Sequence, residues 1–341
     1  MIPAVVISAI GLVMLLSWST LTVSTQNTGF ERRFISGVLS EYKVMETGKG
    51  VTDLAGHTGS RLYFKLTLPS KILTTDLEFN NKRIIQIDVP ADTRIESRFT
   101  TIVDSPNITI LAGNVPAVIQ MKENSASKMY KFPEKLFIRA AMLSENSFVF
   151  RGFDPAIKTP DPIFFKGNPI TGAIKKEKNI SVRYNDAGIS SDGLVLFDEK
   201  TNLISVVSFY SNQIMYLDTN LNLIRRSHTI DTFGISNTKA EAIASKKTIT
   251  NVSPKRMVNA SSCVFDGHLF VYSKIKADNE AKKTFDSNSV MDIYDIATNI
   301  YKGSFYIPTH QNGKLYKCKV ANNLLICFYK KSIVSYKLPE F

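Results

Sequence analysis

The sequence predicts an all-β protein, a β-propeller of about six blades, each a four-stranded antiparallel sheet. Three observations predict this fold. Short runs of β-branched and aromatic residues follow one another along the 341-residue chain, whereas amphipathic stretches of helical length are scarce. Asn, Asp and Gly residues separate many of these runs, as they do in tight hairpins. A unit of about four such runs recurs, which indicates repeated blades instead of one layered sandwich.

Beyond a polar stretch that ends near residue 60, most of the chain consists of predicted strands. Their residues are those that fit a pleated, half-buried surface. In order, the predicted strands are Leu62–Leu66, Ile72–Phe79, Arg83–Val89, Phe99–Val103, Ile108–Leu111, Ala117–Met121, Phe137–Leu143, Phe148–Phe153, Leu194–Phe197, Ile204–Tyr210, Gln213–Leu217, Leu223–His228, Val264–Phe265, Leu269–Tyr272, Val290–Tyr294, Tyr301–Ile307, Leu315–Val320, Leu324–Tyr329 and Ile333–Tyr336.

The residues between these runs predict how the strands are joined. Asn and Gly tolerate the positive φ that tight hairpins need. Such residues separate apolar runs at Asn80-Asn81, Ser144-Glu145-Asn146, Asp266-Gly267, Asn312-Gly313 and Ala321-Asn322-Asn323. Neighbouring strands are therefore expected to be antiparallel and local in sequence, which argues against a doubly wound α/β fold.

Two copies of a repeating unit can be compared directly. Residues 194–230 read LVLFDEKTNLISVVSFYSNQIMYLDTNLNLIRRSHTI, and a second copy combines SSCVFDGHLFVYSKIKA with VMDIYDIATNIYKGSFYIP. Their segments YLDTNLNLIRRSHTI and IYDIATNIYKGSFYI align as aromatic, apolar, Asp, turn, apolar, polar and apolar positions. This pattern is typical of the outer hairpin of a propeller blade, with the Asp at the start of the turn between the third and fourth strands.

These two segments resemble the blades of six-bladed, TolB-like propellers, which are common among exported bacterial proteins. Similar units fall near residues 98–132 and 137–175, and the resemblance extends from Ser60 to the end of the chain, with room for five to seven blades. The C-terminal LYKCKVANNLLICFYKKSIVSYKL supplies about three strands of a last blade. The missing outer strand is expected from the N-terminal side, around Phe34–Val44 or Leu62–Leu66, because such closure removes an open sheet edge.

The first residues predict the compartment. Ile2–Val23 reads IPAVVISAIGLVMLLSWSTLTV and contains no charged residue. This composition predicts a signal peptide or membrane anchor, so the protein is expected outside the cytoplasm, periplasmic or at the cell surface, secreted or anchored. Arg32 and Arg33 follow the apolar run, against the usual charge bias of exported chains, and a buried N-terminal helix is the alternative. The predicted organisation is residues 1–25 as signal or anchor, 26–59 as a polar linker with a possible closing strand, and 60–341 as the propeller.

Charge and cysteine content limit the possible partners. The formal net charge is +12, and from Lys239 onward 16 Lys and Arg face 8 Asp and Glu. The basic residues are scattered and match no nucleic-acid motif, so we expect no nucleic-acid partner and a surface that maintains solubility; an acidic partner is the alternative. Cys263, Cys318 and Cys327 are too few for a disulfide framework. Cys318 and Cys327 are able to pair across strands in an exported protein, and the alternative is that these thiols are small buried apolar groups.

Five residues are candidate ligand contacts: Arg151, Asp154, Lys166, Asp186 and Asp192. They lie in two Pro- or Gly-containing stretches, FVFRGFD with PDPIFFKG and YNDAGISSDGLVLFDE, that suit loops on one face of a propeller. The alternative is that the Phe residues pack between blades and that the Asp residues form a turn into a blade. The Asp spacing departs from that of a calcium-binding EF-hand, and the four histidines are isolated, so no metal site is predicted.

The sequence contains no recognisable catalytic motif. We therefore expect a non-catalytic binding or scaffold propeller, monomeric and without a cofactor, that offers a rigid face to another protein or a small ligand and meets the membrane through its N-terminal segment. The alternative is a metal-dependent hydrolase or lactonase-like enzyme with carboxylates and a divalent cation in the central channel. A β-sandwich surface module is a third possibility.

Overall fold

The structure is a computed structural model of the 341-residue chain. It describes residues 28–341 apart from residues 38, 48–49, 91–92, 97–98, 133–134, 157–160, 235–239, 244–247 and 252–255. The predicted signal or anchor segment, residues 1–25, lies outside the described residues. Among those described, no helix is long and apolar enough to span a membrane.

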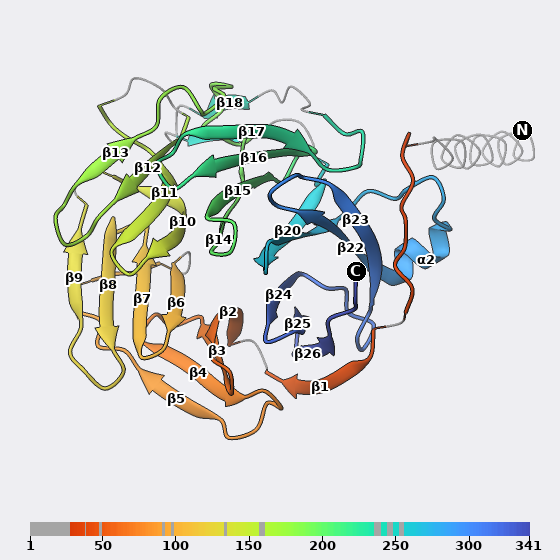
Figure 1. Ribbon diagram of the computed structural model, residues 1–341. Helices are drawn as coiled ribbons and strands as arrows, with labels where there is room; N and C mark the ends of the chain where they lie inside the picture. The colour runs from red at the N-terminus through yellow and green to blue at the C-terminus, as the bar shows by residue number, and fades with distance from the viewer. Residues whose placement is uncertain are drawn as a thin grey trace, which may run out of the picture.

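The described strands form six four-stranded antiparallel sheets around a central axis, so the predicted six-bladed β-propeller is confirmed (Figure 1). From the axis outward, blade A is β2 (Val51–His57), β3 (Arg61–Leu66), β4 (Lys71–Asp76) and β5 (Arg83–Gln86), and blade B is β6 (Thr100–Asp104), β7 (Asn107–Ala112), β8 (Ala117–Lys122) and β9 (Lys128–Lys131). Blade C is β10 (Phe137–Ser144), β11 (Ser147–Gly152), β12 (Ile163–Gly167) and β13 (Ile174–Lys176), and blade D is β14 (Gly193–Asp198), β15 (Leu203–Ser208), β16 (Gln213–Asp218) and β17 (Leu223–His228). Blade E is β20 (Asn259–Phe265), β21 (His268–Ser273), β22 (Asn288–Asp295) and β23 (Tyr301–Pro308), and blade F is β24 (Lys317–Ala321), β25 (Leu324–Phe328), β26 (Ser332–Lys337) and β1 (Glu41–Glu46).

Two elements lie outside the blades. The hairpin of β18 (Ala240–Ile243) and β19 (Thr248–Asn251) connects blade D to blade E, and the short helix α2 (Lys282–Ser287) lies between β21 and β22. Neither element is among the strands that the sequence predicts. The same holds for the outer strands β9 and β13, which are short and mostly exposed and so lack the apolar pattern of a buried strand.

Each blade follows the same path, and this fixes the two faces of the disc. Inner strands begin at one end of the molecule, here called the connector face because the chain enters each blade there. They finish at the other end, here called the back face. Neighbouring inner strands come close together near the axis: a Cβ built on Gly56 of β2 would lie 1.9 Å from the carbonyl oxygen of Val103 in β6. Glycine is required there because no side chain fits.

The ring is closed by the N-terminal part of the chain. Strand β1 pairs antiparallel with β26 and becomes the outer strand of blade F. Of the two predicted closing segments, Phe34–Val44 overlaps this strand, whereas the prediction for Leu62–Leu66 is wrong because those residues form β3. Strand β2, the inner strand of blade A, falls within the stretch 26–59 that the sequence suggests is a linker.

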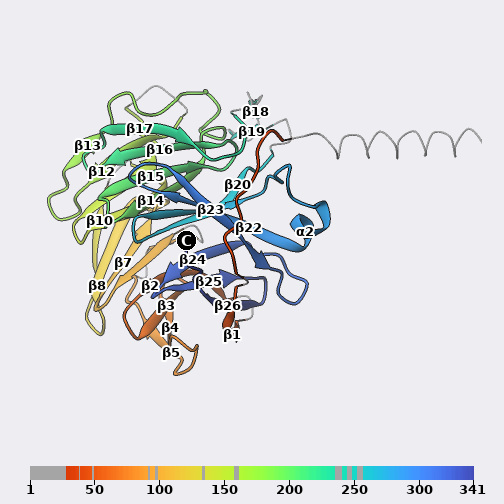
Figure 2. The same ribbon diagram turned by 45° about the vertical axis from the view of Figure 1, so that its right-hand side comes forward.

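Before it reaches blade F, the chain crosses the outer edge of blade E as an extended segment, residues 28–37, which we call the N-terminal strap (Figure 2). The Ile35 amide donates to the Ser304 carbonyl, and the Ser304 amide donates to the Arg33 carbonyl, both at 2.9 Å. The Phe34 ring stacks on Tyr306 with centroids 4.5 Å apart. A Cβ on Gly303, whose φ is +145°, would come within 2.7 Å of the Ile35 side chain, so glycine permits this close approach.

An aspartate begins the turn between the third and fourth strands in three blades, as the repeat predicts for two of them. Asp218 accepts hydrogen bonds from the backbone amides of Asn220 and Asn222, both at 2.8 Å. Asp295 accepts from the amide of Thr298 at 2.8 Å, and Asp76 in blade A plays the same role. The predicted tight turns at Asp266-Gly267 and Asn322-Asn323 are confirmed, with positive φ at all four residues. Asn312-Gly313 instead lies in the connection between blades E and F.

The core consists of apolar layers between adjacent sheets. The layer between blades B and C is aromatic, with Phe137, Phe148, Phe150 and Phe165 packed against Val118 and their neighbours. Phe148 and Phe150 therefore follow the packing alternative for the FVFRGFD stretch. All three cysteines lie between blades E and F as buried free thiols, with Cys318 directly opposite Cys327 in the β24–β25 pair.

Candidate functional site

The structure brings two of the five predicted site residues into direct contact on the connector face. Arg151 is the next-to-last residue of β11, and Asp192 ends the loop 177–192 that connects blade C to blade D. The Arg151 Nη1 lies 3.3 Å from the Asp192 Oδ1, and its Nη2 donates to the Ser191 hydroxyl at 2.7 Å. Arg151 is only 2% exposed. A loop residue of one blade thus pairs with a buried guanidinium of the preceding blade.

A third charged side chain completes this arrangement. Arg139, near the start of β10, donates to the other Asp192 oxygen at 2.8 Å and to the Gly193 carbonyl at 2.9 Å. One carboxylate is therefore shared by two guanidinium groups. Burial lowers the pKa of Arg151, and the nearby Asp192 carboxylate opposes that shift.

The loop that carries Asp192 is held by a carboxylate from the neighbouring loop. Asp161 accepts hydrogen bonds from the amides of Asn185, Asp186 and Gly188 at 2.7, 3.1 and 3.0 Å. Asp186 is 2% exposed, and its Oδ2 accepts from the Ser190 amide at 2.8 Å. Both carboxylates thus order the loop through its backbone.

Asp154 lies apart from Arg151 and Asp192, in an ion-pair cluster of its own. Its Oδ1 is 3.0 Å from the Lys135 Nζ, and its other oxygen pairs with Lys176. Burial alone would raise the pKa of Asp154, but the hydrogen bonds from Lys176 and Lys135 outweigh it and lower the pKa to about 2. Lys166 lies within β12, opposite Val149 and Lys175, and does not line the pocket beside Arg151.

A pocket between blades C and D lies next to the Arg151 guanidinium, and we call it the C–D pocket. Its polar groups are two guanidiniums, four serine hydroxyls, a phenol and an amide, over an apolar floor. The lining residues are Arg151, Phe164, Ser181, Val182, Tyr184, Ser190, Ser191, Val206, Ser208, Gln213, Met215 and Arg226. Nearly all of its polar side chains can donate a hydrogen bond, and none is a carboxylate, so the pocket suits a ligand group that accepts hydrogen bonds and is negatively charged.

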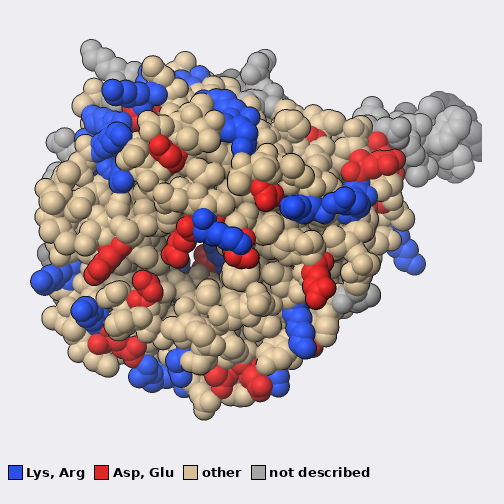
Figure 3. Space-filling view, in the orientation of Figure 1, with Lys and Arg blue, Asp and Glu red and all other residues tan. Residues whose placement is uncertain are grey.

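Basic side chains also gather on the surface around this pocket, over β13 and β17 (Figure 3). Among the exposed residues there are Lys175, Lys178, Arg183 and Arg226. The Arg226 guanidinium donates to the Ile180 carbonyl at 2.6 Å, and it has no carboxylate within ion-pair distance in the described part of the chain. Burial raises the pKa of the Tyr184 phenol, and the Arg226 charge partly opposes this. The local field therefore favours an anion.

The central channel carries a different set of charges. Figure 3 shows acidic and basic side chains together around the opening. On the adjacent inner strands β24 and β2, the Lys317 Nζ lies 2.8 Å from an Asp53 oxygen, and the lysine outweighs burial to lower the pKa of Asp53. Across the described residues, His, Cys, Asp and Glu side chains form no group of three or more that is placed to hold a metal ion.

Several residues of the site were not among the sequence-based candidates. Arg139 had a usable signal, because it is the single charged residue in the apolar run Phe137–Leu143. Asp161 also had one, as an acidic residue between two prolines. Arg226 and Tyr184 had none, since only the packing of blade D against the loop 177–192 brings them to the C–D pocket.

Comparisons with known proteins give the fold and no family. No protein-family model matches the sequence, and no curated protein matches it. Among solved structures, the chain is similar to a member of the DUF4221 family from Bacteroides vulgatus, with 14% identity, a TM-score of 0.55, and coverage of 88% of this chain and 97% of that one. It is also similar to a catalytically inactive virginiamycin B lyase from Staphylococcus aureus with quinupristin, with 10% identity, a TM-score of 0.51, and coverage of 89% and 99%. At these identities the likeness concerns the fold alone.

Proposed function

We propose that this chain is a non-catalytic, TolB-like binding propeller that works outside the cytoplasm and holds an anionic group of a small ligand or protein partner in the C–D pocket. The six-bladed fold supplies a rigid support, and fold alone does not specify chemistry. The proposal therefore rests on the site.

The carrying observation is the buried guanidinium of Arg151 in the wall of the C–D pocket. A guanidinium has five N–H donors in a fixed fork. In the structure, Arg151 makes one short hydrogen bond, to Ser191, and one longer contact, to Asp192. Donors remain for a carboxylate or phosphate, and hydrogen bonds between ionised partners are the stronger ones. Arg226 adds a second positive charge that has no carboxylate partner among the described residues.

Asp192 keeps the site in its binding geometry before a ligand arrives. Asp192 accepts from Arg139 on one oxygen and contacts Arg151 with the other, so the Arg151 guanidinium in the pocket wall is held in one orientation. A preoriented donor set loses less conformational entropy when it binds. The proposed location outside the cytoplasm is supported by the apolar run Ile2–Val23.

The melting temperature of the purified 341-residue chain, measured with and without three anions, tests this function. The anions are acetate, succinate and inorganic phosphate. Because a ligand that binds the folded state stabilises it, we expect at least one probe to raise the melting temperature. Arg226→Gln should raise the probe concentration needed for the same rise in melting temperature by about tenfold, which corresponds to one lost charge-assisted hydrogen bond. Lys200→Gln is the matched control, because Lys200 is exposed and pairs with Asp266 away from the pocket.

Three results would contradict the proposal. The first is that no probe changes the melting temperature, and the second is that Arg226→Gln responds like the wild type. The third is that the protein converts a bound compound to a product. The last result would favour the enzyme alternative.

A further inference from the structure

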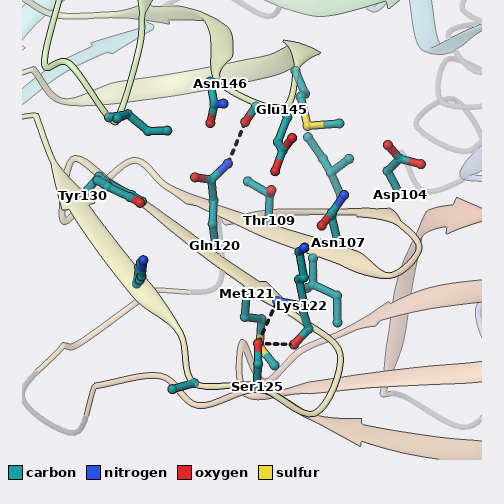
Figure 4. A pocket seen from close by; sticks show the side chains of 16 residues that line it. Asp104, Asn107, Thr109, Gln120, Met121, Lys122, Ser125, Tyr130, Glu145 and Asn146 are labelled. Carbon is teal, nitrogen blue, oxygen red and sulfur yellow. Dashed lines mark hydrogen bonds between the residues drawn. The ribbon is translucent and has the colours of Figure 1, made fainter.

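A second pocket lies at the other end of the molecule, between blades B and C on the back face (Figure 4). We call it the B–C pocket. Its volume is about 310 Å³, at the lower end of the roughly 300–1,000 Å³ that ligand sites occupy. Its polar walls come from the β6–β7 turn, the end of β8, strand β9 and the β10–β11 turn, and they include Asn107, Gln120, Tyr130 and Asn146.

The floor of the B–C pocket contains a hydroxyl that has no hydrogen-bond partner among the described residues. Thr109 of β7 is 5% exposed, and its side chain points into the pocket (Figure 4). Its hydroxyl forms no side-chain hydrogen bond with any described residue. The hydroxyl oxygen itself is open to the pocket, so a ligand atom that fills the pocket would find an unused donor and acceptor.

The charges around this pocket cancel. The lining contains two acidic residues, Asp104 and Glu145, and two basic residues, Lys122 and Lys128. None of the four forms an ion pair with a described residue. The pocket thus has no net formal charge, unlike the C–D pocket. A neutral ligand fits it better than an anion or a cation.

The remaining lining combines amides with apolar surface. Side-chain amides offer donors and acceptors in one plane, and Asn107 and Asn146 supply two of them. Met121, Met142 and the Tyr130 ring add apolar contacts. Vicinal hydroxyl groups on an apolar carbon ring match this alternation of polar and apolar surface, because each hydroxyl both donates and accepts while the C–H face packs on the apolar side chains.

One wall of the pocket is fixed by a link between the two blades. The Gln120 amide nitrogen of blade B donates to the Glu145 carbonyl of blade C at 2.6 Å, which Figure 4 marks as a dashed line. At the opposite end, Ser125 bonds both the amide and the carbonyl of Lys122 and closes the β8–β9 turn. These bonds do not use Thr109, Asn107 or Asn146, so the ligand-facing groups remain available in a preformed site.

The geometry points to a second binding site here, the B–C pocket, which takes a neutral sugar unit such as the end of a glycan chain. This site is independent of the anion site proposed above, because it lies on the opposite face and shares no residue with it. A propeller with both sites would hold a glycan on the back face and an anionic ligand or partner group on the connector face.

Isothermal titration calorimetry of the 341-residue protein tests the inference, with glucose, galactose, mannose, N-acetylglucosamine and short oligomers of each as ligands. At least one sugar should bind, and Thr109→Val should weaken its binding by about tenfold because one hydrogen bond is lost. Since the Thr109 hydroxyl has no partner in the free protein, the same variant should keep the wild-type melting temperature. Thr101→Val is the matched control, because Thr101 is equally buried on neighbouring β6 and does not line the pocket.

The outcomes separate this site from the anion site. Arg226→Gln should leave sugar binding unchanged, and Thr109→Val should leave the response to anions unchanged. If no sugar binds, if Thr109→Val binds sugar like the wild type, or if a zwitterionic dipeptide competes for the site better than any sugar, the inference is wrong. Failure of the anion probes with retained sugar binding would overturn only the proposed function.

Discussion

Arg32 of the N-terminal strap and Asp292 of β22 form a bidentate ion pair, with the Nε and Nη2 atoms 2.8 and 3.0 Å from the two carboxylate oxygens. The same guanidinium pairs with Glu280 and donates to the Ile275 carbonyl at 2.9 Å. Arg32 is 3% exposed. Burial alone would lower the pKa of the guanidinium, but Asp292 and Glu280 raise it. The strap is therefore held to blade E by a buried charge that makes four hydrogen bonds.

Arg32→Met should destabilise the protein by about 3–5 kcal/mol, because it leaves two buried carboxylates without their partner. Urea unfolding measures the loss. Arg33→Met is the control: Arg33 is exposed, and its replacement should cost about 1 kcal/mol or less. Equal stabilities of the two variants would show that the strap does not depend on this pair.

The Asp154 cluster predicts a loss of stability in acid. The pKa of this carboxyl is about 2 in the folded protein and about 3.9 when unfolded, so its contribution is complete above about pH 4 and disappears as the pH falls through 2. The free energy of unfolding of the wild type should exceed that of Asp154→Asn by on the order of 2 kcal/mol at pH 6 and by little at pH 2. Chemical denaturation across that range measures the difference, with the exposed Asp104→Asn as control. A difference that does not change with pH would contradict the assignment.

The three cysteines should behave as buried free thiols. Burial raises the pKa of Cys327, and contact with Cys263 together with burial raises that of Cys318. The hydrogen bond with Cys318 lowers the pKa of Cys263, but all three side chains are buried and so shielded from a reagent. Because the thiolate is the reactive form, the native protein should react slowly with a thiol reagent at pH 8, and the denatured protein should show all three thiols. A count of one thiol after denaturation without reductant would instead indicate a disulfide, and peptide mapping would show whether it joins Cys318 to Cys327.

The N-terminal segment should direct export. Fusion of residues 1–60 to alkaline phosphatase, which is active only outside the cytoplasm, should give an active enzyme in a bacterial host. The matched fusion of residues 26–60 should give none, since it lacks the apolar run. Equal activity of the two fusions would contradict the predicted location.

Local features of the sequence predicted most of the fold. Some features depend only on residues within a few positions of one another: the alternation within strands, the turn at Asp266-Gly267 and the turn that Asp218 begins. They can therefore be predicted without the tertiary structure. The outer strands β9 and β13 were missed for the complementary reason: they are exposed and carry little apolar pattern. Strand β2 was missed although it is an inner strand, because VTDLAGH contains few large apolar residues.

The sequence by itself determined that the chain forms short antiparallel strands in repeated four-stranded units, because backbone preference and hairpin chemistry act over short distances. Only the tertiary structure decided which segment closes the ring, how Arg139 and Arg151 share the Asp192 carboxylate, and that Thr109 faces a pocket. Those contacts join different blades or distant parts of the chain. Their partners are chosen by the packing of whole sheets around the axis, and no local pattern encodes that choice.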